Sequence, residues 1–413
     1  MDTGDTAWML ISTALVLFMT PGLAFFYGGM VRGKNVLNML MMNFSAMGLL
    51  AVLWVLFVFS LAFGNLGDSG LLGNLDWAGL QGVGLEPLES DFLTLTFPFV
   101  LFAAYQMTFA VITPALITGA IAERMKFSAY LLFIGLWLIL VYAPVAHWVF
   151  AGGWLAAMGA LDFAGGAVVH INAGAAALAL IIVLGKRKGW PGEAMHPHNL
   201  PFTLLGTGIL WFGWFGFNAG SALAANGLAA QALMNTFVAA SAAMLGWMLA
   251  ERLKTGNATS LGAASGAVAG LVAITPCAGF VDGMASIAIG FVAGVVCLLA
   301  IQLKFRLGYD DSLDVVGVHL VGGLIGSILL GLFANSSINS VVTNQGLFLG
   351  GGTELLKDQI VASFVTLGFS FVVSLILAKV LDLVMGIRVT AEQEQEGLDQ
   401  SQHAEAAYAI DAG

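Results

Sequence analysis

The chain has 413 residues, of which 59% are hydrophobic and only 9% are charged. Soluble domains carry roughly 25% charged residues, so the composition excludes an ordinary soluble protein and indicates an integral membrane protein. The net charge of −10 says little about partners, because the acids gather in loops and in the C-terminal tail. No nucleic-acid partner is expected. Because the apolar runs do not alternate with polar residues, they do not fit a transmembrane barrel of strands, and we expect an all-α, polytopic membrane protein.

The chain starts with "MDTGDTAW", which contains no Lys or Arg. A secretory signal needs a basic start, so we expect the first helix to be retained. Eleven apolar runs follow, and each is long enough to approach the roughly 20 helical residues that cross a hydrocarbon core. They cover approximately residues 7–31, 36–63, 92–120, 127–148, 164–185, 200–220, 231–252, 259–276, 284–305, 315–334 and 356–386. Residues 64–91 are too polar and too rich in glycine to span a membrane.

The basic residues test this count, because nearly all of them follow or end the odd-numbered spans. One side of the predicted membrane holds Arg32, Lys34, Arg124, Lys126, Lys186, Arg187, Lys188, Arg252, Lys254, Lys304, Arg306, Lys379 and Arg388. Of the 14 Lys and Arg residues, only Lys357 falls on the opposite side. Since cytoplasmic loops carry the excess of basic residues, we predict an inner or plasma membrane protein with its N-terminus outside and its C-terminus in the cytoplasm.

A short internal repeat places two histidines at equivalent positions. The fifth span contains "VVHINAG" with His170, and the tenth contains "GVHLVGG" with His319. Each histidine lies in the fifth helix of a set of five, and an odd number of helices per repeat inserts the two halves with opposite orientation. We therefore predict an inverted 5+5 repeat, with halves at about residues 7–190 and 200–335 and a final helix at about 356–386. Inverted repeats place their substrate path near the membrane centre, so the two rings are expected to meet there.

The histidines have other interpretations. An intramembrane histidine can be a structural residue that bonds a backbone carbonyl of a neighbouring helix. Two histidines can also ligate a haem, but the glycine-rich helices around them suit close packing better than a macrocycle cavity. Neutral imidazole is both a donor and an acceptor, so a pair can pass a proton or hold a small hydrogen-bonding solute. We favour this last interpretation.

No cofactor and no metal site are expected. The two cysteines, Cys277 and Cys297, lie in apolar surroundings and match no metal-binding spacing. We predict that both are buried free thiols. The sequence shows no nucleophile with a positioned acid and base, so it does not indicate an enzyme.

Several longer motifs resemble those of the ammonium transporter (Amt) family, in the family's order and over about residues 6–408. They are "TPGLAFFYGGMVRGKN", "AYQMTFAVITPALITGAIAERM", "ALDFAGGAVVHINAG", "PHNLP", "GWFGFNAGSA", "DDSLDVVGVHLVGG" and "EQEQEGLDQSQHAEAAY". The resemblance implies a homotrimer in the lipid bilayer, in which each eleven-helix subunit holds a pore for the uptake of ammonium or methylammonium. It also implies that His170 and His319 are the twin histidines of that pore.

The resemblance extends to other pore residues. Phe109 and Phe217 resemble the stacked phenylalanines that gate the outer side of the pore. Ser221 resembles the serine of the external recruitment site, and Asp162 resembles the acid that shapes this site. The residues alone leave other roles open, because an aromatic residue in an apolar helix is usually part of the core, and Asp162 can simply cap the fifth span.

The outer site departs from the family pattern at two positions. Many members carry Trp in the block where this chain reads "AHWVFAGG", which places Phe150 at the recruitment position. Tyr105 stands where some members have Phe. Trp attracts cations best, and Phe lacks the indole N–H. The recruitment site is therefore expected to bind the cation more weakly, unless the adjacent Trp148 supplies the aromatic ring in place of Phe150.

A charge inside an apolar pore is costly, so ammonium is expected to lose a proton before ammonia crosses. Two other functions stay open at this point. One is a Rhesus-type channel for ammonia or carbon dioxide, although the intact "GWFGFNAGSA" and "EGLDQSQHAEAAY" motifs match the Amt pattern better. The other is a membrane sensor that binds ammonium and signals through its tail.

The polar, acidic tail at residues 391–413 is predicted to be separate from a transmembrane domain at residues 1–390. Terminal segments of this kind are often simply solvated. The resemblance implies instead an ordered cytoplasmic segment that packs under neighbouring subunits. It also implies a docking surface for a PII-type signal protein.

Overall fold

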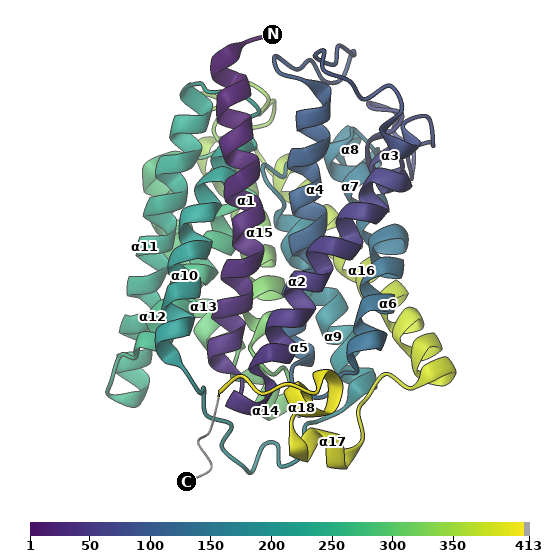
Figure 1. Cartoon of the computed structure of the whole chain (residues 1–413). Coiled ribbons are helices and arrows are strands. Elements are labelled where there is room, and N and C mark those ends of the chain that lie inside the picture. Colours follow the sequence, from purple (N-terminus) through teal and green to yellow (C-terminus); the bar gives the residue numbers. More distant parts are fainter. Residues whose placement is uncertain (409–413) are drawn as a thin grey trace.

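The computed structural model describes residues 1–408, which form a bundle of long helices (Figure 1). The N-terminus lies at the upper end of the bundle, and the chain passes the lower end as it reaches the C-terminus. Extended pairing within the described residues is limited to isolated bridges, such as that between Met125 and Arg388. The all-α fold predicted from composition is confirmed.

Within residues 1–408, ten helical segments are long and apolar enough to cross a membrane. They are Thr3–Met30, Gly33–Phe63, Phe99–Ile121, Phe127–Met158, Gly166–Leu184, Leu200–Ala219, Gly227–Thr255, Gly283–Leu307, Val316–Phe333 and Glu354–Met385. At the position of the eighth predicted span lies a shorter apolar helix, α12 (Ser260–Ile274), with 15 residues. Every predicted run therefore forms a helix, but the eighth is shorter than expected.

The individual elements are shorter than these segments because several are joined end to end. The first part of the chain contains α1 (Thr3–Met30), η1 (Gly33–Asn35), α2 (Val36–Leu53), η2 (Trp54–Val58), α3 (Phe59–Phe63), η3 (Ala78–Leu80), α4 (Phe99–Leu116), α5 (Thr118–Ile121), α6 (Phe127–Trp137), η4 (Leu138–Tyr142), α7 (Ala143–Phe150), α8 (Trp154–Met158), η5 (Gly166–Ile171) and α9 (Asn172–Leu184). The second part contains α10 (Leu200–Trp214), η6 (Phe215–Ala219), α11 (Gly227–Thr255), α12, α13 (Gly283–Ala300), α14 (Leu303–Leu307), η7 (Val316–Leu320), α15 (Val321–Phe333), η8 (Leu347–Leu349), α16 (Glu354–Met385), α17 (Ala391–Glu396) and α18 (Leu398–His403).

Five of these elements, η2, η4, η5, η6 and η7, are π-helical turns. A π turn inserts one extra residue into a helix, at a cost in regular hydrogen bonding, and such turns often occur at functional sites. Three of the five carry residues that the sequence singles out, namely His170 in η5, Phe217 in η6 and His319 in η7.

The helices start where side chains can accept hydrogen bonds from otherwise unpaired backbone N–H groups. Asp2 caps α1, Asn199 caps α10, Asn226 caps α11 and Thr259 caps α12 in this way. Asp282 does the same for α13. These polar residues stand at the borders of apolar runs. Each of them fixes the residue at which the next helix starts.

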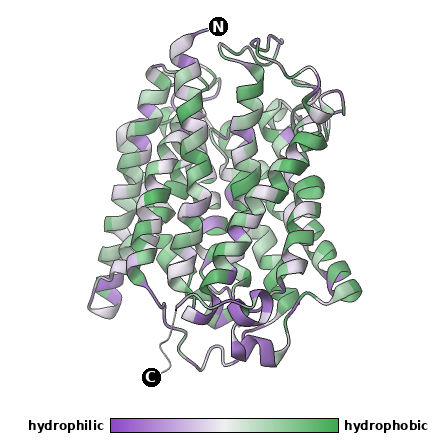
Figure 2. Ribbon diagram, in the orientation of Figure 1, coloured by the Kyte–Doolittle hydropathy of each residue, from purple (hydrophilic) through white to green (hydrophobic). Residues whose placement is uncertain are grey.

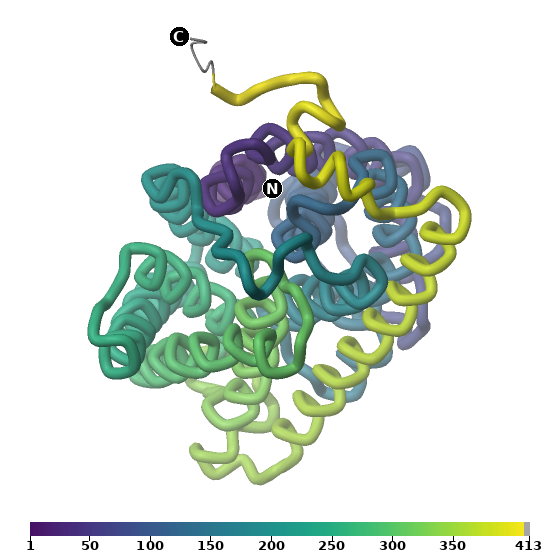
Figure 3. The backbone as a smooth tube through the Cα atoms, turned by 90° about the horizontal axis from the view of Figure 1, so that it is seen from below, coloured from purple at the N-terminus to yellow at the C-terminus, as the bar shows by residue number. Residues whose placement is uncertain are grey.

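The helices pack closely through small residues. A Cβ atom at Gly206 of α10 would lie 2.2 Å from the backbone N of Phe26 in α1, and one at Gly294 of α13 would lie 2.1 Å from the carbonyl of Ala243 in α11. Such contacts let backbones approach each other, as is usual between membrane helices. Figure 3 shows the earlier helices, purple to blue, grouped beside the later green ones, while α16 runs along the outside and packs against α9 and α15.

The sides of the bundle are apolar, whereas the lower end is hydrophilic (Figure 2). Large apolar side chains such as Leu245, Leu249, Ile376 and Val380 are exposed on the outward faces of α11 and α16. A helical bundle with this surface suits a hydrocarbon environment, since its backbone polar groups are satisfied internally. The structure is that of a multi-pass membrane protein.

The tail folds back against the lower end of the bundle, as Figures 1 and 3 show. The backbone N–H of Leu398 donates to Asn35 Oδ1 at 2.8 Å, and Asp399 Oδ1 accepts from the N–H of Asn38 at 2.8 Å. At the end of the described chain, the Tyr408 hydroxyl lies 2.8 Å from His198 Nε2. Residues 391–408 are therefore packed on the chain's own helices rather than freely solvated.

Candidate functional site

The two repeat histidines meet in the interior of the bundle. His319 Nδ1 lies 3.3 Å from His170 Nδ1, and the ring centroids are 5.3 Å apart with an angle of 26° between the planes. Both side chains are buried. The contact between the rings that the repeat predicts is thus present. At this distance one Nδ1 donates and the other accepts, which neutral imidazoles of opposite tautomer can do.

Each histidine occupies the same local setting. The Asp162 carboxylate accepts hydrogen bonds from four successive N–H groups at the start of η5, at 2.7 to 3.3 Å. The Asp311 carboxylate accepts from the N–H groups at the start of η7, including that of Val316 at 2.7 Å. In both motifs the aspartate stands eight residues before the histidine. A carboxylate is favourable at a helix start. Both π turns therefore begin with the same interaction, an aspartate that accepts hydrogen bonds from their first N–H groups.

The repeat glycines make the approach of these two segments possible. A Cβ atom at Gly174 would lie 2.5 Å from the backbone N of Leu320, directly after His319. In the other half, a Cβ atom at Gly323 would lie 3.0 Å from the carbonyl of Gly166 and 3.1 Å from the Cβ of His170. Because each glycine lacks a side chain, the histidine-bearing turn of the opposite half can pack directly against its backbone.

A column of aromatic rings leads to the histidines. The rings of Phe109 and Phe217 have centroids 4.3 Å apart, with an angle of 39° between their planes. The Phe217 ring is in turn stacked on His170 at 6.1 Å, and Trp214 is stacked on His170 at 5.5 Å. The two predicted gate residues are thus in contact, and one of them contacts the histidine pair.

Two hydroxyl groups lie at the end of this column that is remote from the histidines, and they bond to the backbone there. The Tyr105 hydroxyl lies 2.9 Å and 3.0 Å from the carbonyls of Gly216 and Phe217, and 3.2 Å from Ser221 Oγ. Ser221 Oγ donates to the Phe217 carbonyl at 2.8 Å. A π turn leaves carbonyls without regular partners, and these hydroxyls bind the carbonyls of η6.

Trp148, on α7, lies in a different environment. The indole N–H of Trp148 donates to the carbonyl of Leu71 at 2.8 Å, and its ring packs against Trp154 and Phe369. Within residues 1–408, the Trp148 ring pairs with these two rings and not with the phenylalanine column. Phe150, the last residue of α7, is half-buried against the main core.

A narrow cavity runs past the histidine pair. Its lining is apolar apart from the two imidazoles. The centre of a water-sized molecule can occupy a volume of about 10 Å³ inside it, so the cavity has room for roughly one water. It is lined by Met19, Leu23, Phe26, Ile112, Leu116, Val169, His170, Leu210, Trp214, Phe217, Val268 and His319. His170 Nε2 is buried and has no hydrogen-bond partner within the described chain.

A second cavity of about 30 Å³ for the same centre follows on the other side of His319. Phe26, Val268 and His319 border both cavities, so the second continues the first. Its lining is more polar and includes Tyr27, whose hydroxyl lies 3.5 Å from His319 Nε2, and Asp314. His319 therefore lies between an apolar cavity and a more polar one.

The site contains residues that sequence reasoning did not select. Asp311, Trp214 and Tyr27 each contact or cap the histidine pair or its cavities. A signal existed for Asp311, because "LDFAGGAVVH" and "DDSLDVVGVH" both place an aspartate at the same spacing. Trp214 and Tyr27 lie inside quoted motifs, but nothing in a single sequence distinguishes them from core aromatics.

A buried apolar path that passes two imidazoles inside a bundle of membrane helices defines a membrane transporter or channel. Within residues 1–408 no group of three or more His, Cys, Asp or Glu side chains is arranged to hold a metal ion. The sequence profile described as the Ammonium Transporter Family matches residues 7–408. The chain belongs to that family, and it is a transport protein rather than an enzyme.

Individual relatives agree with this assignment. An ammonium transporter of Mycobacterium tuberculosis is 55% identical over 433 residues, which cover 98% of this chain and 90% of the relative. The crystal structure of Saccharomyces cerevisiae Mep2 matches with a TM-score of 0.87 at 35% identity, covering 95% of this chain and 88% of that one. A solved structure described as a "Sensor Amt Protein" matches with a TM-score of 0.88 at 28% identity, covering 97% and 98%.

We predict that Gly174→Ala destabilises the protein more than Gly323→Ala. The new Cβ at residue 174 meets backbone at 2.5 Å, whereas at residue 323 the nearest atom is 3.0 Å away. Overpacking of this kind costs roughly 1–3 kcal/mol. Thermal unfolding in detergent measures the effect, with Gly208→Ala in open space as the control. Equal unfolding temperatures for the variants at residues 174 and 208 would show that the crossing tolerates a side chain.

Proposed function

We propose that this protein takes up ammonium through a pore in each subunit. The cation is recruited at an outer aromatic site, loses a proton, and crosses as ammonia past the twin histidines His170 and His319. The observation that carries the proposal is the cavity beside these rings, which has room for one small molecule and is apolar where the two imidazole rings border it. Ammonia matches this site in size and in its ability to donate and accept hydrogen bonds.

The apolar lining supports selection against metal cations. Moving a charge into such a lining is costly, and ammonium, sodium and potassium all bear such a cost. Only ammonium can avoid the cost by releasing a proton. His170 Nε2 is free to bond the resulting ammonia, while the contact between the rings offers a route by which the proton can move.

For the outer recruitment site we propose Phe150, Ser221, Tyr105 and Asp162, with Phe109 and Phe217 as the gate below it. The hydroxyls of Tyr105 and Ser221 support this proposal, because they meet at 3.2 Å beside the turn that carries Phe217. A role for Trp148 has less support, since its N–H is already bonded to Leu71.

The proposal extends to the architecture. We propose eleven spanning helices in an inverted 5+5 repeat, with α12 as the eighth, and the domain boundaries stated from the sequence. The equivalent settings of His170 and His319, each after a capping aspartate and before a glycine, support the repeat. The plasma membrane location, the outside N-terminus and the homotrimer are part of the same proposal.

A PII-type protein is proposed as a partner at the cytoplasmic end. The packed tail at residues 391–408 supports the idea of a defined surface there. The predicted tail also includes residues 409–413, which lie outside the described residues.

A second candidate function is that of a membrane ammonium sensor. It is favoured by one observation, the similarity to a structure described as a "Sensor Amt Protein". Transport current and uptake in proteoliposomes, measured with ammonium, methylammonium and potassium, separate the two functions. A transporter gives flux with the first two and none with potassium, whereas a pure sensor binds ammonium without flux.

We predict that His170→Ala and His319→Ala each yield a folded protein that loses most ammonium flux or admits potassium. Either change removes one partner of the ring contact in the cavity lining. Proteoliposome uptake and current are the measurements, with size-exclusion profiles as the check of folding. Wild-type rates and intact exclusion of potassium in both variants would mean that the histidines are only structural.

We predict that Phe150→Trp increases apparent affinity for ammonium at the outer site. A Trp ring in place of Phe strengthens cation–π attraction by about 0.5–1 kcal/mol at an exposed position. This corresponds to a dissociation constant that is roughly two- to fivefold lower. The concentration dependence of methylammonium uptake measures the change, and an unaltered affinity would place the recruitment site elsewhere.

A further inference from the structure

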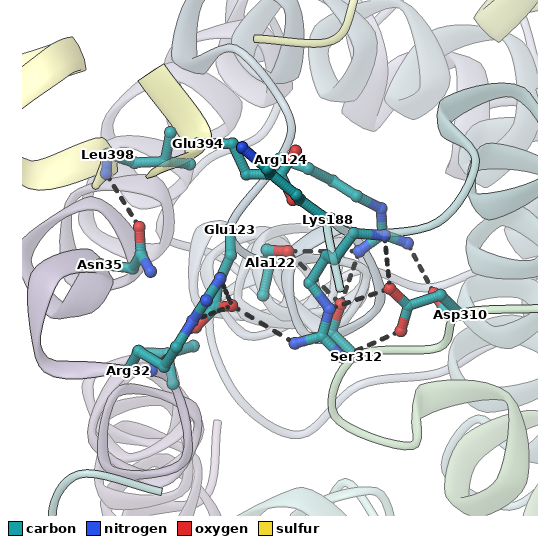
Figure 4. Close-up of polar contacts among 12 residues, drawn as sticks. Arg32, Asn35, Ala122, Glu123, Arg124, Lys188, Asp310, Ser312, Glu394 and Leu398 are labelled. Atoms are coloured by element: carbon teal, nitrogen blue, oxygen red, sulfur yellow. Dashed lines mark hydrogen bonds and ion pairs between the residues drawn. The ribbon is translucent and has the colours of Figure 1, made fainter. Parts of the chain in front are cut away.

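Arg124 is a fully buried arginine in the link between α5 and α6, at the lower end of the bundle. Its guanidinium donates to four acceptors. Nε bonds the carbonyl of Gly185 at 3.0 Å, and Nη2 bonds the carbonyl of Asp310 at 2.6 Å. Nη1 bonds Ser312 Oγ at 2.6 Å and the carbonyl of Ala122 at 3.2 Å. Figure 4 shows Arg124 together with Ala122, Asp310 and Ser312.

Three of the four acceptors belong to the two segments that carry the histidines, and the fourth, Ala122, lies two residues before Arg124. Gly185 is the C-terminal cap of α9, the helix that continues from His170. Asp310 and Ser312 stand on either side of Asp311, whose carboxylate caps the turn that carries His319. Arg124 therefore joins the end of one histidine helix to the start of the other.

The surrounding charges are already paired with one another. Arg187 bonds both carboxylate oxygens of Asp310 at 2.9 Å, and Glu123 binds Arg32 at 2.6 Å. Burial alone would raise the pKa of Asp310, but hydrogen bonding and attraction from Arg187 lower it below its ordinary value. For Glu123, burial is likewise outweighed by Arg32 and Arg187, so its pKa is also lowered.

In contrast, Arg124 makes no ion pair within the described chain, and its acceptors are three carbonyls and a hydroxyl. A buried cation without a carboxylate partner is costly to stability. The position of Arg124 is therefore better explained by the way its hydrogen bonds fix neighbouring segments relative to one another than by charge pairing. Arginine suits this task because its planar fork fixes several acceptors at once, whereas lysine presents a single charged point.

We propose that Arg124 is a positioning residue of the pore, which sets the contact between His170 and His319 by fixing the ends of their helices to each other. The inference rests on the proposed function of the histidine pair as the path for ammonia and proton. Under this proposal, the distance between the two imidazole rings depends on hydrogen bonds at the lower end of the bundle. These hydrogen bonds involve neither ring.

The test uses Arg124→Lys and Ser312→Ala in the full-length protein. The lysine keeps the charge but cannot reach all four acceptors, and the alanine removes one acceptor while the arginine stays. Arg252→Lys, at an exposed position in the last turn of α11, is the matched control. Folding is checked by size exclusion and thermal unfolding, and Ser312→Ala decides the test if the Arg124 variant does not fold.

Two readouts are measured, maximal methylammonium uptake in proteoliposomes and the ¹⁵N NMR signals of labelled histidines. Because a small displacement at a distance lowers rates strongly, we expect on the order of tenfold slower maximal uptake for Arg124→Lys. Ser312→Ala should show a smaller loss in the same direction. In both variants the apparent affinity stays as in the wild type, while the Nδ1 signals shift as the hydrogen bond between the rings weakens.

Unchanged histidine signals in folded variants would overturn the positioning role, and so would a change in affinity without a change in maximal uptake. The NMR readout does not depend on transport. If the wild-type protein carries no flux but the variants still shift the Nδ1 signals, the proposed function fails while the positioning role stands.

Discussion

The structure depends on keeping two imidazoles in contact inside an apolar bundle. Polar rings and π turns are both costly in such surroundings unless their hydrogen bonds are satisfied. Here Asp162 and Asp311 satisfy the first N–H groups of the two turns. Gly174 and the matching glycine in the other half let the backbones approach closely enough for the rings to meet. Most of the central architecture follows from this requirement, including the close crossing of α9 with η7.

The lower end of the bundle is where chain segments far apart in sequence are joined. Arg124 links the ends of the two histidine helices, and Arg388 donates to the carbonyl of Leu184 at 2.7 Å and to Glu394 at 2.8 Å. The tail, through Glu394, therefore contacts the same helix end that Arg124 holds. Side-chain hydrogen bonds of Arg388 thus connect the tail with the end of the helix that continues from His170.

The interior of the bundle combines an apolar cavity, a pair of imidazoles and a more polar cavity in that order. This order separates two tasks. The apolar lining makes charge expensive, and the imidazoles of His170 and His319 bring hydrogen-bonding groups next to it. Transport and sensing of ammonium both need such discrimination, so measured flux, rather than the architecture of the pore, distinguishes the two functions.

Hydropathy determined the helices and composition determined the membrane class, because each span is a local run of apolar residues and needs no tertiary information. The histidine pair was also accessible from the sequence, since the repeat marks His170 and His319 as equivalent. The roles of Arg124 and Trp214 were not accessible, because they arise from contacts between residues tens to hundreds of positions apart. Only the tertiary structure decided which polar groups face each other across the bundle, since local sequence specifies how a helix starts and how apolar it is but not which neighbour it meets.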